Sequence, residues 1–318
     1  MTAKRIFITG ASGCIGHYIV DLLIENTPHE LYLLLRNPDK LKVDIHRRPG
    51  IHILPGSMGE VEQFSDLLKT MNVGILAATS WGDPKETFEI NVTKTLQLMN
   101  LFDPGVCEQI LYFSTASILN RQNQPLPEAG EIGTDYIRSK YDCFTKLGDL
   151  AIAPHITALF PTLVFGGDEN KPYSHLSSGL AEVAKWMGLA RFFTADGSFH
   201  FMHGYDIAQV VGYLVEHPAQ PPQFRKVVLG NPRVTAQQMI TEFANYLGLQ
   251  VYFQFPLTTW LANFFIAAFR LQMAAWDRFS MNYRHFYHES PTNPATLGLK
   301  TAYPTLADIL KATGITKG

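Results

Sequence analysis

The sequence RIFITGASGCIG, residues 5–16, decides the fold of this chain. A short apolar run, Ile6 to Ile8, is stopped by glycine and followed by apolar residues at helical spacing, which predicts a strand, a tight turn and a helix. Gly10 permits the strained turn, Gly13 removes the Cβ that would block a pyrophosphate, and Gly16 lets the helix lie against the strand. The N–H groups and the positive end of that helix then face an anion. We therefore predict a nucleotide site, which also includes Ser12, Cys14 and Ile15.

Length and composition limit the class of protein. The chain has 318 residues, which suits one large α/β domain or a domain with an appended lobe. A formal net charge of -2 gives no electrostatic reason to expect a nucleic-acid partner. The three cysteines, Cys14, Cys107 and Cys143, cannot all pair, and the first strand leaves no room for a signal peptide before it. We expect a cytoplasmic protein in a reducing compartment.

Strands and helices alternate through the first half of the chain. Apolar runs predict strands at 31–35, 51–54, 73–78 and 109–113, with helical patterns between them. This alternation predicts an α/β fold with a doubly wound parallel sheet and a ligand across the carboxyl ends of its strands. The helix that begins at Lys85 has one apolar stripe, expected to face the sheet, formed by Phe88, Val92, Leu96 and Met99.

The second predicted strand indicates which dinucleotide is bound. It ends in Leu35-Arg36, at the point where a βαβ nucleotide unit meets the adenosine ribose. A carboxylate there would accept the 2′-hydroxyl, whereas an arginine would accommodate a 2′-phosphate. Because no carboxylate is present, we expect NADP(H) rather than NAD(H), with Lys40 or Lys42 as a second cation.

Two further segments are expected beside the cofactor. Ser57 and Met58 follow the third strand and should pass near the adenine. The fourth strand ends in the small residues Ala77 and Ala78, which let the backbone approach a ligand.

Tyr136 and Lys140 lie four residues apart on a predicted helix, so their side chains share one face. A phenol has a reference pKa of about 10, and an ammonium fixed beside it lowers that pKa by favouring phenolate. A hydroxyl after the fifth strand, Thr115 or Ser114, could hold a substrate oxygen at the same point. Taken alone, such a pair is also common on helix surfaces.

Together these motifs resemble the extended short-chain dehydrogenase/reductase family, the group that holds the sugar-nucleotide epimerases, dehydratases and 3β-hydroxysteroid dehydrogenases. The matching segments lie in the family's order over residues 1 to about 235, at 9–16, 91–93, 112–115, 136–140, 161–166 and 201–208. The resemblance implies a Rossmann domain at 1–166, completed by about 206–230. A smaller, mostly helical substrate lobe would comprise 167–205 and 231–318.

The resemblance also implies a role for each matching residue. Tyr136 would be the general acid/base at the substrate oxygen, Lys140 would bind the nicotinamide ribose and tune the tyrosine, and Thr115 falls at the family's Ser/Thr position. The residues implied around the cofactor are Gly10, Gly13 and Gly16 at the pyrophosphate, Arg36 at the 2′-phosphate, Asn91 as an organiser of the site, and Pro161.

Departures from the family pattern bear on the substrate. An Ala-Ser pair at 116–117 replaces the Asp-Glu pair with which the 4,6-dehydratases remove water. Leu163 and Phe199 stand where the epimerases use an asparagine and an arginine to hold a diphosphate, although Arg225 or Arg233 could substitute. We therefore expect an oxidoreductase that interconverts a carbonyl and a secondary alcohol on a rather apolar small molecule. The alternatives are a sugar-nucleotide epimerase or reductase, and a non-catalytic nucleotide-binding assembly or redox-sensing protein.

Residues 251–269 are rich in aromatic and aliphatic side chains, and polar interruptions argue against a bilayer span. Three interpretations stand: a lid over an apolar substrate, a helix lying on a membrane surface, and core of the lobe. The possible partners are therefore a small-molecule substrate and, through 251–286, a membrane to which the protein is peripheral. Helices such as 85–102 and 136–150 pair in dimers of the family, so a homodimer is also possible.

The histidine pattern does not predict a metal site. His200 and His203 are three residues apart, but no nearby cysteine or carboxylate set completes a ligand sphere. We expect no metal, and we interpret His203 as a structural residue ahead of the helix that starts at Asp206. His285 and His288 are expected at the surface.

Overall fold

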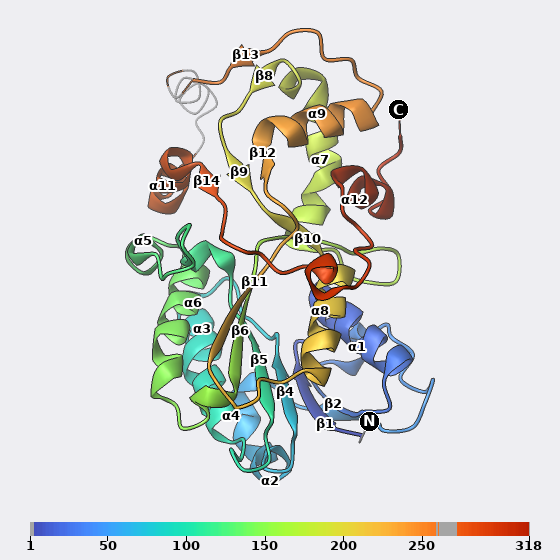
Figure 1. Ribbon diagram of the computed structural model, residues 1–318, viewed down its shortest axis with the longest axis vertical. Coiled ribbons are helices and arrows are strands. Elements are labelled where there is room, and N and C mark those ends of the chain that lie inside the picture. The colour runs from blue at the N-terminus through green and yellow to red at the C-terminus, as the bar shows by residue number, and fades with distance from the viewer. Residues whose placement is uncertain (1–2, 259, 261–271, 318) are drawn as a thin grey trace.

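The structure is a computed structural model that describes residues 3–258, 260 and 272–317. The molecule is elongated, with a large sheet and its helices at one end and a smaller lobe at the other (Figure 1). The C-terminal segment returns from the lobe and runs beside the junction between the two parts.

Seven parallel strands of the described chain form the central sheet, in the order β11-β6-β5-β4-β1-β2-β3. Their bounds are β1 (Arg5–Thr9), β2 (Glu30–Leu35), β3 (Ile51–Pro55), β4 (Val73–Leu76), β5 (Gln109–Phe113), β6 (Ile156–Pro161) and β11 (Arg225–Leu229). The chain winds outward from β1 to β3 and then returns to β4 on the other side of β1. The doubly wound parallel sheet is therefore confirmed, with its winding reversed between β1 and β4.

Alternate residues of β1 face two separate helical layers. Ile6 and Ile8 belong to a core that includes α1 (Cys14–Asn26) and α8 (Gly204–Glu216), which pack on each other. Phe7 points to the opposite face, where the core includes α6 (Asp135–Lys146). Burial of the strand on both faces explains why residues 6–8 form an unbroken apolar run.

The helix after β4 is interrupted by a π-turn. α3 (Pro84–Phe88) continues into the π-turn Glu89–Lys94 and then into α4 (Thr95–Asn100). The wider turn shifts the helix faces, so Phe88 is exposed and its expected place in the sheet-facing stripe is wrong, whereas Val92 and Met99 are buried. The same turn carries Asn91 into the interior.

The small lobe packs three helices around an apolar core. They are α7 (His175–Ala190), α9 (Ala236–Tyr246) and α12 (Leu306–Ala312), and α11 (Ala275–Tyr283) lies beside the junction (Figure 1). Short strands complete the lobe: β7 (Leu163–Phe165) with β10 (Phe201–His203), β8 (Phe193–Thr194) with β13 (Phe255–Pro256), and β9 (Ser198–Phe199) with β12 (Val234–Thr235) and β14 (His285–Phe286).

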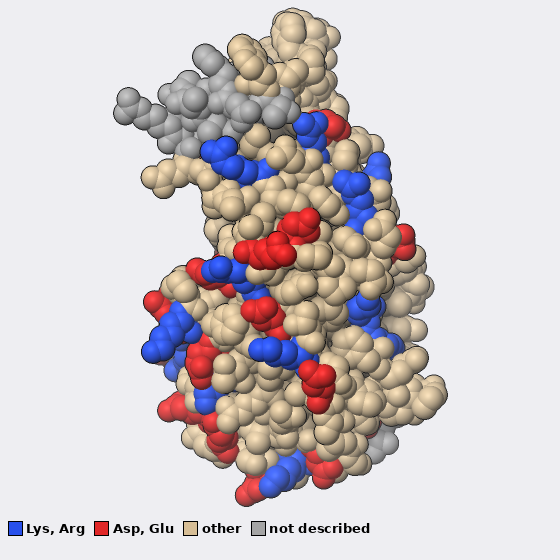
Figure 2. Space-filling view, turned by 90° about the vertical axis from the view of Figure 1, so that its left-hand side faces the viewer, with Lys and Arg blue, Asp and Glu red and all other residues tan. Residues whose placement is uncertain are grey.

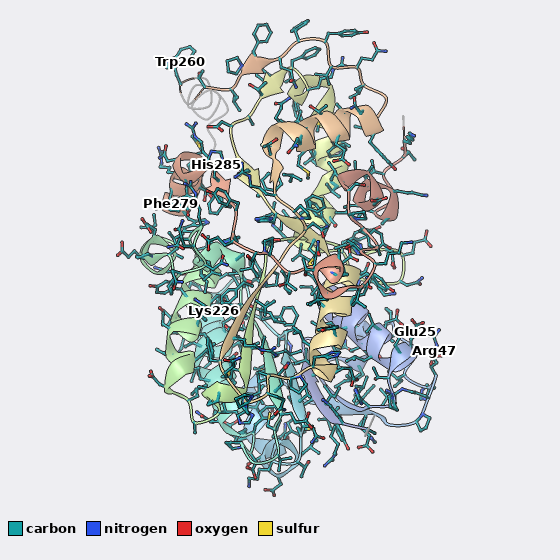
Figure 3. The ribbon with its side chains drawn as sticks, in the orientation of Figure 1. Glu25, Arg47, Lys226, Trp260, Phe279 and His285 are labelled. Carbon is teal, nitrogen blue, oxygen red and sulfur yellow. The ribbon has the colours of Figure 1, made fainter. Side chains whose placement is uncertain are left out.

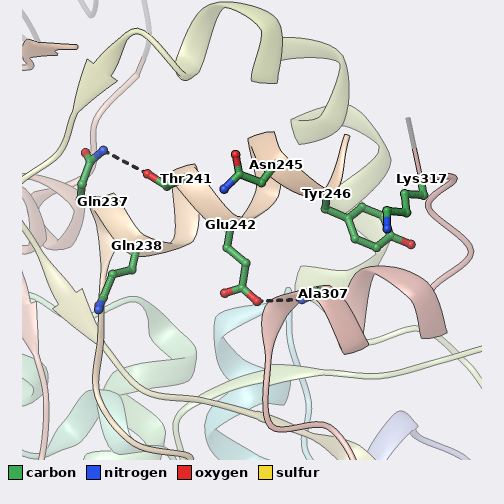
Figure 4. A pocket seen from close by; sticks show the side chains of 8 residues that line it. All are labelled: Gln237, Gln238, Thr241, Glu242, Asn245, Tyr246, Ala307 and Lys317. Atoms are coloured by element: carbon green, nitrogen blue, oxygen red, sulfur yellow. Dashed lines mark hydrogen bonds between the residues drawn. The ribbon is translucent and has the colours of Figure 1, made fainter. Parts of the chain in front are cut away.

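A hollow of about 510 Å³ lies along α9 and α12 (Figure 4). Its lining comprises Gln237, Gln238, Thr241, Glu242, Asn245, Tyr246, Ala307 and Lys317. Two of these side chains hold the lobe together: Glu242 accepts a hydrogen bond from the Ala307 N–H at 3.1 Å, and the Tyr246 hydroxyl donates to the Ile315 carbonyl at 2.9 Å. We attribute the hollow to the packing of α9 against α12.

Buried histidines fix the junction between the parts. His203 Nδ1 accepts a hydrogen bond from the Tyr205 N–H at 3.2 Å, and its ring stacks on Tyr303 with centroids 3.8 Å apart. His288 is buried, because its backbone N–H donates to His200 Nε2 at 3.0 Å and its ring lies against that of His200. The expectation of a surface position is therefore wrong for His288, and His285 is half-buried.

Acid should destabilise this junction. Burial lowers the pKa of His203 and of His288 from 6.5 to about 4, the nearby Asp168 opposing the shift at His203. Between these values the unfolded chain binds more protons than the native protein, so the free energy of unfolding falls as pH falls from about 6.5 towards about 4 and is fully retained above about 6.5. Urea unfolding across this range measures the loss.

His203→Asn tests whether this loss of stability in acid comes from His203. Asparagine keeps a side-chain acceptor at the start of α8 but does not titrate there, so the loss of stability on acidification should be smaller. If the free energy of unfolding of this variant falls as steeply on acidification as that of the wild type, the assignment to His203 is wrong.

Candidate functional site

The glycine turn forms a cradle where β1 meets β4. Gly10 has φ +75°, and a Cβ there would lie 2.6 Å from the Ala77 carbonyl carbon. A Cβ on Gly16 would lie 2.0 Å from the Gly10 carbonyl oxygen, so the absence of a side chain at Gly16 lets α1 approach β1, and its absence at Gly10 lets the turn approach the end of β4. Gly13 is exposed at the N-cap of α1, and no side chain caps the helix. The N–H groups of the first turn thus remain open to an anion, which fits a dinucleotide pyrophosphate.

The side chains around this cradle are neutral. Ser12, Cys14 and Ile15 are half-buried in the turn and the first helical residues. Burial raises the pKa of the Cys14 thiol to about 12, so no thiolate forms beside the anion site at neutral pH.

Arg36 is exposed immediately after β2, and no described residue forms a hydrogen bond or an ion pair with it. The Lys42 N–H donates to His17 Nε2 at 3.1 Å, which holds the segment after β2 against α1. An ion pair between Glu25 and Arg47 ties the same segment to α1 (Figure 3). His17, which the sequence pattern does not reveal as a site residue, thus positions the strand end that carries Arg36.

The other cofactor residues take different environments. Ser57 caps the turn after β3, where its hydroxyl and backbone both contact the Glu60 carboxylate, and Met58 is buried. The Ala78 N–H donates to the Thr9 hydroxyl at 3.2 Å, which fixes the end of β4 beside β1. Pro161 is the buried last residue of β6.

Asn91 joins the loop after β4 to α6. Its Oδ1 accepts hydrogen bonds from the Ser80 N–H at 2.8 Å and the Thr79 hydroxyl at 3.0 Å. Its Nδ2 donates to the Ser80 carbonyl and to the Ser139 hydroxyl, each at 3.0 Å. Ser139 lies between Tyr136 and Lys140 on α6, so one buried amide sets the position of both the loop and the helix.

Thr115, Tyr136 and Lys140 meet at the carboxyl ends of β5 and β6. The Thr115 side chain lies beside the Tyr136 phenol, where it opposes the rise in the pKa of that phenol, and its hydroxyl donates to the Ser117 hydroxyl at 3.3 Å. Lys140 is buried, its ammonium donates to the Phe113 carbonyl at 2.9 Å, and Nζ lies 5.9 Å from the centroid of the Tyr136 ring. The structure thus brings together the residue types that an acid/base site requires.

The pKa of Tyr136 departs from the sequence-based expectation. Burial raises this pKa above its usual range, and the Thr115 side chain only partly opposes the rise. Lys140 does not lower it, because the ammonium is directed at the Phe113 carbonyl and burial lowers the pKa of Lys140 itself to about 8. The expected lowering of the Tyr136 pKa is therefore wrong for the protein without cofactor.

Trp81 is a site residue that the motifs do not reveal. Its ring stacks on that of Tyr136, with centroids 3.7 Å apart and planes at 12°, although the residue is 61% exposed. On the side of the small lobe, the His175 ring lies 6.4 Å from Trp81. Gly82, which follows with φ +112°, marks the tight turn that presents the indole, but a lone tryptophan in a loop carries no chemical signature.

The arginines proposed to hold a diphosphate lie at opposite ends of the sheet. Arg225 opens β11 and donates to Thr157 and Gln109, at the amino ends of the strands, so its expected substitution for an epimerase arginine is wrong. Arg233 precedes β12, which pairs with Phe199, and its guanidinium lies over the Tyr287 ring at 4.7 Å.

The expectations about a metal site and a bilayer span can be compared with the structure only for the described residues. Within them, no group of three or more His, Cys, Asp or Glu side chains could hold a metal ion. None of the helices in this part of the chain combines the length and the apolarity needed to cross a bilayer. Of the apolar stretch 251–269, residues 259 and 261–269 lie outside the described part.

Solved structures resemble this chain along nearly its whole length. Gox2253 has 17% identical residues and a TM-score of 0.70, with 99% of this chain and 100% of that chain covered. WbmG of Bordetella bronchiseptica, in complex with NAD and UDP, has 14% identity and a TM-score of 0.63 over 99% and 97% of the two chains. UDP-glucose 4-epimerase of Thermotoga maritima, with UDP-glucose, has 13% identity and a TM-score of 0.60 over 98% of each. At these identities the likeness shows the fold.

The sequence itself identifies the family. No curated protein matches it. The profile of the NAD dependent epimerase/dehydratase family, however, matches residues 6–230, which include the glycine cradle and the Tyr136–Lys140 helix. The chain therefore belongs to the NAD-dependent epimerase/dehydratase family and is an NAD(P)-dependent enzyme of the short-chain dehydrogenase type.

Proposed function

We propose that this enzyme interconverts a carbonyl and a secondary alcohol on a rather apolar small molecule, with Tyr136 as general acid/base. The observation that supports this most directly is the half-buried Tyr136 phenol, which lies beside Thr115 and on the same helix as Lys140. The dinucleotide would be held by the cradle of Gly10, Gly13 and Gly16, and when bound it supplies the hydride-exchanging nicotinamide.

Each catalytic residue has a separate task. Thr115 holds the substrate oxygen at the phenol, since its hydroxyl already contacts Tyr136. The raised pKa keeps Tyr136 protonated at neutral pH, so its Oη can give a proton to the oxygen of a carbonyl that is being reduced. Lys140 is buried within reach of the same space and would bind the nicotinamide ribose.

Apolar side chains at the expected substrate positions favour an apolar substrate. The indole of Trp81 covers one face of the phenol, and Leu163 exposes its aliphatic side chain just after Pro161, at the end of β6. Phe199 occupies the place expected of an epimerase arginine. Apolar and aromatic walls with few polar groups are typical of sites for apolar ligands.

A sugar-nucleotide epimerase or reductase is the second candidate, and the comparisons favour it. Two of the three similar structures named above were solved with UDP or UDP-glucose. In this chain Arg233 lies next to β12, and Arg284 forms an ion pair with Asp196 at 3.1 Å beside β14. These two cations of the lobe are the residues that would have to hold a diphosphate in place of Phe199 and Leu163.

The dinucleotide is proposed to be NADP(H). Arg36 is exposed at the end of β2 without a described partner, and the carboxylate expected of a site for the 2′-hydroxyl is missing there. The similar structures include a complex with NAD, so the choice between the two dinucleotides needs a direct test.

The cradle predicts opposite behaviour for two glycine variants. In Gly13→Ala the new Cβ would lie 3.3 Å from the Gly10 carbonyl oxygen, so the fold should persist while the dinucleotide binds about tenfold or more weakly. In Gly16→Ala the Cβ would lie 2.0 Å from the same oxygen, so folding itself should be lost. Calorimetric titration and thermal unfolding separate the two effects. Gly188→Ala in α7, where a Cβ meets nothing within 4 Å, is the control, and unchanged binding by Gly13→Ala would refute the cradle.

Titration with NADPH, NADH and UDP-glucose tests cofactor and substrate class. We expect NADPH to bind more tightly than NADH, and UDP-glucose to show no affinity with or without cofactor. Arg36→Ala should reduce the affinity for NADPH by about tenfold and leave that for NADH unchanged, whereas the nearby Lys40→Ala should have the smaller effect. An equal loss of affinity for both dinucleotides contradicts the assignment of Arg36. Micromolar binding of UDP-glucose favours the second candidate, a sugar-nucleotide epimerase or reductase, over the first.

Tyr136→Phe tests whether the enzyme turns over through this phenol. Removing one oxygen leaves the stack with Trp81 intact, so the variant should fold and bind dinucleotide normally. Its kcat for reduction of apolar ketones and aldehydes should fall by about 10²–10⁴-fold, the usual contribution of a positioned acid. Full retention of the protein's function would indicate the non-catalytic alternative, in which the nucleotide serves assembly or redox sensing.

A further inference from the structure

The end of the small lobe farthest from the sheet exposes a group of large apolar side chains. Tyr252, Phe253, Phe255 and Trp260 are 77%, 59%, 57% and 74% exposed, and we name these four residues the aromatic tip. The segment around β13 runs along this end of the lobe, and Figure 3 shows Trp260 there (Figures 1 and 3). Apolar residues are often exposed singly, whereas a contiguous group marks an interaction site.

The backbone under the aromatic tip is hydrogen-bonded to the lobe. The Phe255 N–H donates to the Phe192 carbonyl at 2.8 Å, and the Leu257 N–H donates to the Thr194 carbonyl at 2.9 Å. The Phe253 ring stacks on Phe192 with centroids 5.4 Å apart. The outward position of these rings is therefore set by strand pairing, which excludes the lobe-core interpretation for them. Their place at the far end of the lobe, away from α6, which carries Tyr136, also excludes the lid interpretation (Figure 1).

The end of α7 enlarges the same apolar surface. Trp186 and Leu189, in its last turn and a half, are both more than half exposed. The Arg191 guanidinium, one residue beyond the helix, donates to the Gln250 carbonyl at 2.9 Å and so fastens the end of α7 to the segment that leads into the aromatic tip. The surface thus combines two elements that are distant in sequence.

The charge pattern identifies the kind of partner. No charged residue occurs between Glu242 and Arg270 in the sequence, and the Arg191 guanidinium, which donates to the Gln250 carbonyl, lies beside this uncharged stretch. Glu182, the acidic residue of α7, is paired with Lys185 at 2.7 Å and accepts a hydrogen bond from the Trp186 indole N–H at 3.3 Å. Figure 2 shows mostly uncharged atoms at this end of the molecule, whereas acidic and basic side chains are mixed over the sheet domain. Exposed aromatic side chains beside a cation match the headgroup region of an anionic bilayer.

The position of this end favours a lipid surface over a protein partner. A stable protein interface buries about 800 Å² on each side and closes over a packed apolar centre. The aromatic tip instead lies at one end of an elongated molecule (Figure 1). A fluid bilayer can accept projecting tryptophan, tyrosine and phenylalanine rings without a complementary pocket.

We infer that the aromatic tip docks this enzyme on the surface of an anionic lipid bilayer. The side chains enter the interface without spanning it, and the dinucleotide cradle at the opposite part of the molecule stays in water. The inference does not rest on the proposed function, although an apolar substrate would be concentrated in the same bilayer.

Co-sedimentation of the full-length protein with vesicles tests the inference. Wild type should partition onto vesicles of phosphatidylcholine and phosphatidylglycerol, and less onto phosphatidylcholine alone. Phe253→Ser combined with Phe255→Ser should weaken the partition by about tenfold or more, because two buried aromatic side chains are lost from the interface. Phe88→Ser, which changes an exposed phenylalanine of the sheet domain, is the matched control and should bind like wild type.

Three outcomes would overturn the inference: wild type that stays in the supernatant with both vesicles, a double variant that binds as well as wild type, and a Phe88→Ser control that loses as much as the double variant. The remaining alternative is that the aromatic tip binds a second copy of the chain, which sedimentation velocity without lipid tests. Self-association of the wild type that the double variant abolishes would assign the surface to that second copy. Dinucleotide titration of each variant shows that the sheet domain remains folded, and its result is independent of lipid binding.

Discussion

The contact between the first turn of α1 and the end of β1 is the constraint on which the rest of the site depends. The Gly16 Cα sits so close to the Gly10 carbonyl that a methyl group there would lie 2.0 Å from the oxygen. This approach places the uncapped helix end at the carboxyl ends of β1 and β4, where the winding of the sheet reverses, and leaves its N–H groups unpaired. An anionic ligand completes those hydrogen bonds, so the cradle combines a packing requirement with a binding function.

The buried Asn91 amide is a second constraint, because it fixes the loop after β4 relative to α6. All four of its hydrogen bonds run to the loop after β4 or to Ser139 on α6. The amide reaches the interior because it lies in a π-turn, a feature that is frequent at functional sites and that costs regular helix geometry. The spacing between Trp81 and Tyr136 therefore depends on one side chain that touches neither ring.

The sequence predicts those features that are local or that repeat with a regular period. The glycine turn, the alternating strands and the Tyr136–Lys140 face all depend on residues within a few positions of one another, and the fold confirms the parallel sheet they imply. The errors concern tertiary neighbours. The π-turn rotates Phe88 outward. Arg225 lies at the amino ends of the strands, away from the site. His288 is buried because the C-terminal segment packs against His200. No periodicity encodes these positions, and the same holds for the stack of Trp81 on Tyr136.

Burial pushes the two titrating groups of the site towards their neutral forms. It raises the pKa of Tyr136, and it lowers the pKa of Lys140 to about 8. Lys140 is therefore the group whose charge is most easily altered near neutral pH, and its ammonium is satisfied by a single carbonyl, that of Phe113. A hydroxyl of a bound ribose would add a second acceptor and raise the pKa of Lys140 again. Ligand binding and protonation of Lys140 are then coupled, so the cradle and the acid/base pair act as one site although they lie on different strands.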